Sequence, residues 1–187
     1  MYFAIFYSSN KTLKGAFSIM VTTNRKQRIY ATRIDLPETT RAEVINILNH
    51  SLATTLDLKT QVKQAHWNVK GINFYQLHLL FDEMATELEG YVDLIAERAT
   101  ALGGTAMGTA RMAVADTILP EFPLDLANDK DYVVALADRY APYGKMVREA
   151  IDKTSGLGDA DTVDLYTGIS RAIDQRLWFL ESHLQGN

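Results

Sequence analysis

The stretch HWNVKGINFYQLHLLFDEMATELEGYVDLIAERATALGG, residues 66–104, contains the pattern that decides the fold. From Phe74 to about Leu102, apolar residues recur every three or four positions, at Leu77, Phe81, Met84, Leu88, Val92 and Ile95. This spacing places them along one side of a helix, so the segment is predicted to be a long helix buried on one face. The Gly103-Gly104 pair is expected to end it, because glycine readily adopts the conformations that close a helix.

Three other long helical patterns have expected bounds of about 41–69, 128–153 and 161–184. The first begins with a capping box of Thr40 and Glu43, and Asp161 is expected to cap the last. Pro142 lies inside the third pattern and predicts a kink, because proline lacks an N–H group and crowds the preceding turn.

The connection over residues 105–127 contains two prolines, and one short helix is expected in it near Ala110–Asp116. The sequence shows no alternation typical of strands and no internal repeat. Four long helices with a longer middle connection predict an all-α fold. The expected architecture is a four-helix bundle with a short extra helix between the second and third helices.

The composition is that of a folded protein of about one domain. The chain has 187 residues, of which 47% are hydrophobic, a net charge of −4 and no cysteine. The lack of cysteine excludes disulfides, thiolate metal sites and a thiol nucleophile. No apolar run approaches the length of a membrane-spanning helix, and the apolar start MYFAIFY lacks the features of a signal peptide. We therefore expect a cytoplasmic protein without a membrane partner.

Charge is distributed unevenly along the chain. The first 34 residues contain six basic side chains and no acidic one, whereas acidic side chains predominate in the remainder. We expect a flexible basic N-terminal tail over residues 1–35 and a helical domain over residues 36–187. The tail could bind DNA in a salt-sensitive, non-specific way, or it could be an ordinary solvated terminus. Met20 could be the natural start of the protein. The candidate DNA contacts are Lys11, Lys14, Arg25, Lys26 and Arg28.

Histidines and carboxylates gather on neighbouring helix faces. His66 lies on the buried stripe of the first helix. Four side chains of the second helix fall within an arc of about 100° around its axis, namely His78, Asp82, Asp93 and Glu97. They form two pairs with a spacing of four residues, at which two side chains can bind one ion. Imidazole and carboxylate donors together suit Fe(II), Mn(II) or Zn(II).

The two pairs are too far apart to bind one ion within a single chain. Their centres are separated by roughly 22 Å of helix, whereas metal ligands lie about 2 Å from their ion. Either the pairs are unrelated half-sites, or an antiparallel copy of the helix from a second subunit brings unlike pairs together. A two-fold axis would then create two equivalent sites, each completed by His66. Solvated hydrogen-bonded pairs and a core histidine are the simpler alternatives.

The same residues resemble a known family. The segment 66–104 is similar to the Dps family, the starvation-induced DNA-protecting mini-ferritins. The resemblance rests on His66-Trp67-Asn68, on Gly71 and on the spacing His-x11-His-x3-Asp-x10-Asp-x3-Glu. It continues through FPLDLANDKDY, ALADRYA and DTVDLYTGISRAIDQRLWFLES and covers about residues 29–184. It implies a ferritin-like four-helix bundle that assembles into a hollow homo-dodecamer.

The resemblance also implies an enzyme, a ferroxidase with iron sites at two-fold interfaces. It would oxidise Fe(II), preferentially with hydrogen peroxide, and store Fe(III), protecting the cell and its DNA. In the family, one subunit supplies two histidines and an aspartate, here His66, His78 and Asp82. The partner supplies the residues that correspond to Asp93 and Glu97. This division agrees with the one that the length of the helix requires.

Further roles follow from the same resemblance. Trp67 could donate an electron to an oxidising intermediate, or it could pack at a subunit interface. Asp161 and Asp164 match acidic residues that line three-fold pores, although Asp161 could also cap its helix. No glutamate is followed by a histidine three residues later, which disfavours ferritins and bacterioferritins with sites inside one bundle. A zinc-holding dodecamer and a DNA-compacting shell, associated with the nucleoid, are the alternative functions.

Overall fold

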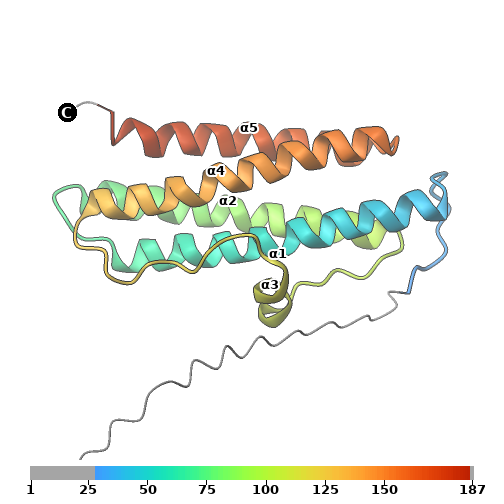
Figure 1. Cartoon of the computed structure of the whole chain (residues 1–187), viewed down its shortest axis with the longest axis horizontal. Coiled ribbons are helices and arrows are strands. Elements are labelled where there is room, and N and C mark those ends of the chain that lie inside the picture. Colours follow the sequence, from blue (N-terminus) through green and yellow to red (C-terminus); the bar gives the residue numbers. More distant parts are fainter. Residues whose placement is uncertain (1–27, 186–187) are drawn as a thin grey trace, which may run out of the picture.

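The computed structural model describes residues 28–185. Its helices are α1 (Glu38–Asn68), α2 (Phe74–Ala101), α3 (Ala110–Asp116), α4 (Asp129–Gly156) and α5 (Ala160–Ser182). The four long helices form a bundle of two antiparallel hairpins, α1–α2 and α4–α5, and α3 lies on the connection between α2 and α4 (Figure 1). The predicted all-α bundle with a short helix in its middle connection is confirmed.

The helices begin at residues that differ in part from the predicted ones. Thr40 and Glu43 do not form a capping box, because α1 starts three residues earlier and its N-cap is Pro37, which provides no side-chain cap. The N-cap of α5 is Asp159 rather than Asp161, and its carboxylate accepts a hydrogen bond from the Thr162 amide. Both errors are small shifts of the first turn, where several nearby residues can serve as caps.

Other local signals were interpreted correctly. The short helix α3 occupies the predicted residues Ala110–Asp116. Asn128 caps α4 and forms a reciprocal capping box with Asp131. Pro142 lies inside α4, which continues on both sides of it, and the kink expected there stays a prediction.

The core lies between the four long helices and includes three buried tyrosines. Tyr140, Tyr143 and Tyr166 are each at most 1% exposed. The Tyr143 hydroxyl hydrogen-bonds with Thr55 of α1 at 2.8 Å, and Tyr166 donates to Ser51 of α1 at 2.8 Å. The helices are therefore joined by hydrogen bonds as well as by apolar packing.

Residues 28–36 pack against the end of the bundle where α2 ends. The Tyr30 amide donates to the Gly103 carbonyl at 2.8 Å, and the Arg41 guanidinium donates to the carbonyls of Tyr30 and Leu102. Gly103 has φ +90°, and a side chain there would collide with the Tyr30 carbonyl. Residues 1–27, which include most of the expected basic tail, lie outside the described part of the chain.

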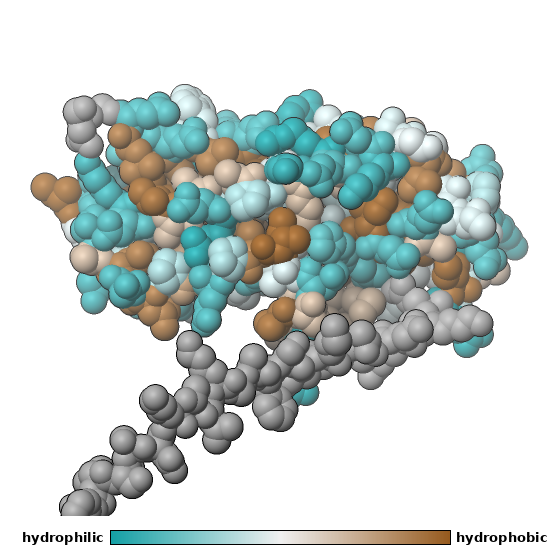
Figure 2. Space-filling view, in the orientation of Figure 1, coloured by the Kyte–Doolittle hydropathy of each residue, from teal (hydrophilic) through white to brown (hydrophobic). Residues whose placement is uncertain are grey.

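Apolar groups on the surface are interspersed with hydrophilic ones on the face that Figure 2 shows. Within residues 28–185, no helix is both long enough and apolar enough to cross a membrane.

Candidate metal centre

The centre lies at the end of the α1–α2 hairpin where the two helices are joined. His66 belongs to the last turn of α1 and His78 to the second turn of α2. Because the helices are antiparallel, the two side chains face each other. Their rings stack with centroids 3.8 Å apart and planes inclined by 20°.

Reciprocal hydrogen bonds fix both imidazoles. Nδ1 of His66 donates to the main-chain carbonyl of His78 at 2.7 Å, and Nδ1 of His78 donates to the carbonyl of His66 at 2.8 Å. A carbonyl can only accept, so each ring has its proton on Nδ1 in the form that can bind a metal, with the lone pair on Nε2. An outer hydrogen bond of this kind orients a histidine for metal binding through Nε2.

Asp82 follows His78 by one helical turn and extends the donor set. Its Oδ1 atom is 3.9 Å from Nε2 of His66 and accepts a hydrogen bond from Lys63 Nζ at 2.7 Å. The hydrogen bond from Lys63 lowers the pKa of Asp82 below its usual value, and the positive charge of Lys63 acts in the same direction. Asp82 is therefore an anion at neutral pH, and a cation that binds it competes with Lys63.

The donors lie at the surface, beside an exposed apolar area. His66 is only 9% exposed, but His78 is half-buried and Asp82 is exposed. Five large apolar side chains around them have exposed fractions of 44–93%, and we call them the turn patch: Trp67, Ile72, Phe74, Tyr75 and Leu79. Exposed apolar side chains that are close together in this way are typical of a site that another protein covers.

The second predicted pair lies farther along α2. Asp93 and Glu97 are exposed side chains of the same continuous helix as His78. The rise of a helix separates the two pairs by roughly 22 Å, as the sequence predicts. No three His, Cys, Asp or Glu side chains of residues 28–185 form a complete metal-binding group. Within one chain, the two pairs are therefore separate.

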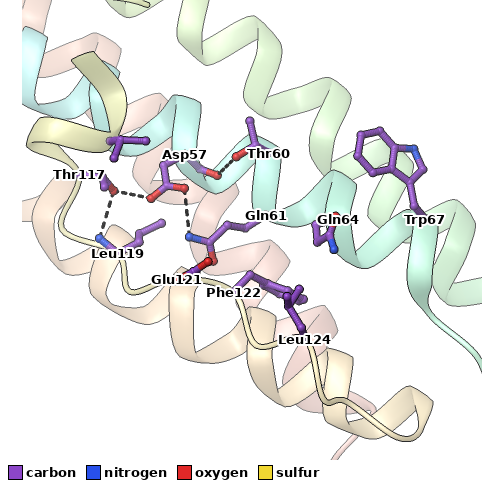
Figure 3. A pocket seen from close by; sticks show the side chains of 11 residues that line it. Asp57, Thr60, Gln61, Gln64, Trp67, Thr117, Leu119, Glu121, Phe122 and Leu124 are labelled. Carbon is purple, nitrogen blue, oxygen red and sulfur yellow. Dashed lines mark hydrogen bonds between the residues drawn. The ribbon is translucent and has the colours of Figure 1, made fainter. Parts of the chain in front are cut away.

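Trp67 belongs to the turn patch and also lines a groove of about 620 Å³ beside α1. The groove is lined by the outer face of α1 and by residues that follow α3, and Trp67 stands at the end far from Thr117 (Figure 3). Its indole ring is 66% exposed, and the Lys63 ammonium group is 5.9 Å from the ring centroid. Trp67 is next to His66 in sequence, but its side chain forms part of the molecular surface.

The acidic residues at the start of α5 differ in environment. Asp161 and Asp164 are exposed, and the carboxylate of Asp161 is 3.6 Å from Arg98. Asp159 is 2% exposed, and its carboxylate accepts hydrogen bonds from Arg98 and from the Thr162 hydroxyl, both at 2.5 Å. Asp159 therefore has a structural role, whereas the other two carboxylates are accessible to solvent.

Two features of the centre could not be read from the sequence. The contact of Lys63 with Asp82 joins residues 19 positions apart, on separate helices. The reciprocal histidine bonds use main-chain carbonyls, which have no sequence signature. The one available signal for Lys63 is its position one turn before His66, which places it on the same side of α1.

The bundle, with histidines and carboxylates on adjacent helices, is characteristic of ferritin-like proteins. The ferritin-like domain family matches residues 45–186 of the chain. A DNA protection during starvation protein from Agrobacterium fabrum is 43% identical over 158 residues, covering 84% of this chain and 98% of the relative.

Solved structures agree with this similarity. DpsC from Streptomyces coelicolor superimposes with a TM-score of 0.81 at 31% identity, over 85% of this chain and 93% of that one. Dps from Mycobacterium smegmatis gives a TM-score of 0.81 at 27% identity, over 85% and 96% of the two chains. The chain thus belongs to the Dps family of ferritin-like proteins.

Proposed function

We propose that this protein is a ferroxidase that oxidises Fe(II) and stores the Fe(III) product inside a homo-dodecameric shell. The observation that supports this function best is the stacked pair of histidines, in which Nε2 of His66 is 3.9 Å from the Asp82 carboxylate. Two neutral nitrogens can bind Fe(II), and a hard anionic oxygen favours the higher charge of Fe(III). The donor set therefore fits iron as a substrate that changes oxidation state.

Each complete site is proposed to use two subunits. His66, His78 and Asp82 of one chain are completed by the partner's Asp93 and the partner's Glu97. This arrangement is supported by the exposure of Asp93 and Glu97 and by the turn patch, whose apolar surface a second subunit would cover. A two-fold axis makes both contacts at once and so yields two sites in each dimer.

The preferred oxidant in the proposed reaction is hydrogen peroxide. Two Fe(II) ions each lose one electron, and one peroxide molecule takes up these two electrons and two protons to give two waters. No hydroxyl radical is released in this reaction, which would protect DNA and the rest of the cell. Trp67 is proposed to supply an electron when only one Fe(II) is present, a role that its position next to His66 supports.

The carboxylates at the start of α5 are proposed to admit iron. Asp161 and Asp164 are exposed, and three copies around a three-fold axis would attract cations into the shell. The basic residues Lys11, Lys14, Arg25 and Lys26 are proposed to contact DNA, and they lie outside the described residues. Arg28 is the one candidate of this group that the structure describes, and it is exposed. A cytoplasmic location, with association with the nucleoid when DNA is bound, fits these proposals.

The decisive experiment combines two inactive variants. One is His78→Ala/Asp82→Ala, and the other is Asp93→Asn/Glu97→Gln. Oxidation of Fe(II) is followed by stopped-flow absorbance, with peroxide and with oxygen in separate runs. Each variant alone is expected to lose fast oxidation, while the particle keeps its size.

Co-expression of the two variants tests whether the site is shared. In a mixed dimer, one site combines both sets of substitutions, and the other retains all its ligands. Random assortment therefore restores about a quarter of the sites, and about a quarter of the wild-type rate is expected. If co-expression restores no activity, the site is not shared between subunits. If the wild type does not accelerate oxidation at all, the ferroxidase proposal is wrong.

A further inference from the structure

A buried carboxylate at the start of α4 contacts the turn between α1 and α2. Asp129 is the first residue of α4 and only 8% exposed. Its Oδ2 atom accepts hydrogen bonds from the main-chain amide of Asn73 at 2.9 Å and from the Asn73 side-chain amide at 3.0 Å. Its Oδ1 atom accepts from the Lys130 amide at 3.0 Å. One side chain thus connects the start of α4 with the residue that precedes α2.

The turn is shaped to receive this carboxylate. Gly71 has φ +143°, and a Cβ atom built there would be 2.6 Å from Cγ of Asp129. A larger residue at this position would therefore be strained and would also displace Asp129. The α1–α2 turn and the start of α4 lie at the same end of the bundle (Figure 1).

The contact is located where it can affect the histidines. Gly71 follows His66 by five residues, and Asn73 precedes His78 by five residues. The histidine rings are fixed by each other's carbonyls, so their positions depend on the register between the end of α1 and the start of α2. That register is set by the turn, and the side chain that holds the turn is Asp129.

We infer that Asp129 is a positioning residue for the iron site. It touches no iron ligand and acts by holding Asn73 and Gly71, so that the reciprocal hydrogen bonds of His66 and His78 are kept. The inference rests on the proposed function, since it concerns the ligands of that site. A role confined to the first turn of α4 is the competing explanation, because a carboxylate is also favourable at a helix N-terminus.

The test uses Co(II), which is stable to oxidation, as the probe of the intact shell. Isothermal titration calorimetry at fixed pH measures Co(II) affinity for the wild type, Asp129→Ala, Asp129→Asn and Asp131→Ala. Loss of a group that hydrogen-bonds a metal ligand typically costs 10- to 100-fold in metal affinity. Asp129 acts on the ligands only through the turn, so we expect the low end of this range, about tenfold, for Asp129→Ala. Asp129→Asn keeps one acceptor oxygen and should recover part of this loss. The same variants should raise KM for Fe(II) with little change in kcat.

Asp131→Ala is the matched control. It removes the capping box of the same helix, whose bonds go to Ala127 and Asn128 and not to the turn. It should lower the thermal midpoint and leave Co(II) affinity within about twofold of the wild type, well below the loss expected for an outer-sphere partner. Gly71→Ala disrupts the contact from the opposite side and should weaken Co(II) binding as Asp129→Ala does.

The inference is overturned if Asp129→Ala binds Co(II) as tightly as the wild type, or if Asp131→Ala weakens binding equally. If Asp129→Ala does not assemble, Asn73→Ala removes only the side-chain amide bond. It should still weaken Co(II) binding, and unchanged binding would overturn the inference. Failure of the proposed function gives a different result, because the unsubstituted protein would then neither bind Co(II) nor oxidise Fe(II). In that case the inference about Asp129 would also be wrong.

Discussion

Two aspartates at the start of α5, the N-cap Asp159 and Asp161, should behave differently when they are replaced. Asp159 is 2% exposed and bonded to Arg98 and Thr162, whereas the side chain of Asp161 is 85% exposed. Replacement of Asp159 by alanine removes a helix cap, which is worth about 1 kcal/mol. It also leaves the guanidinium of Arg98, which is 14% exposed, without its close partner.

The magnitude follows from these contacts. Removing one partner of a buried ion pair costs about 3–5 kcal/mol. Arg98 keeps some solvent contact and the Asp161 carboxylate at 3.6 Å, so the lower end applies. We expect Asp159→Ala to reduce the free energy of unfolding by about 3 kcal/mol per subunit, with the cap included in that sum. Asp161→Ala loses only an exposed pair, which is worth less than about 1 kcal/mol.

Guanidinium unfolding at fixed protein concentration, followed by far-ultraviolet circular dichroism, measures both changes. Concentration is fixed because assembly contributes to the apparent stability. In parallel, Asp161→Asn combined with Asp164→Asn should slow iron uptake at low salt, and added salt should narrow the difference from the wild type. Equal destabilisation by the two alanine substitutions would refute the assignment of Asp159 to the structure and Asp161 to the pore.

Three further predictions concern the core, acid stability and DNA. The Tyr140 hydroxyl is the one buried side-chain polar atom of residues 28–185 without a hydrogen-bond partner, so Tyr140→Phe should raise the free energy of unfolding by about 1 kcal/mol. Tyr143→Phe should lower it by about 1 kcal/mol, because the Tyr143 hydroxyl is hydrogen-bonded to Thr55. Denaturant titrations of the two variants would contradict this if both changes had the same sign. Hydrogen bonds from Asn73 lower the pKa of Asp129 in the folded protein. The ionised carboxylate therefore stabilises the folded state fully above the unfolded-state pKa of about 4, and this contribution is lost as the pH falls below that value. The unfolding midpoint of Asp129→Asn should therefore vary less between pH 5 and pH 3 than that of the wild type. If the midpoints of the two proteins change in parallel with pH, ionised Asp129 does not contribute to acid stability. Deletion of residues 1–27 should abolish a DNA gel shift at low salt, and an unchanged shift would show that the tail is not needed.

The fold could be predicted from the sequence because its determinants are periodic. The apolar stripe of α2 and the short helix Ala110–Asp116 are local patterns, and local patterns specify helices well. The helix ends were less certain, since both Asp159 and Asp161 are good N-caps in sequence. Asp159 differs from Asp161 in that it is buried against Arg98, a residue more than sixty positions away in the sequence. The difference between a structural aspartate and an exposed one therefore depends on tertiary contacts.

The candidate site was predictable only in part, for a similar reason. The five ligands follow from spacing and resemblance, because their side chains lie on regular helices. Spacing does not predict the contacts of Lys63, of the histidine carbonyls or of Asp129. Each of these contacts joins two helices or their ends, and the sequence does not show how the helices are aligned with each other. In the proposed site, these residues would orient the ligands and supply the charges that compete for them.

The length of α2 also links the proposed chemistry to assembly. The helix is unbroken over 28 residues, so the two halves of the donor set are held apart within each chain. No local motion of a side chain can bring Asp93 to His78 across roughly 22 Å of rigid helix. A single chain would therefore have weak, partial sites, and strong iron binding would appear only when a partner covers the turn patch. Iron and subunit association should then stabilise each other, because a ligand that binds only the paired state favours that state.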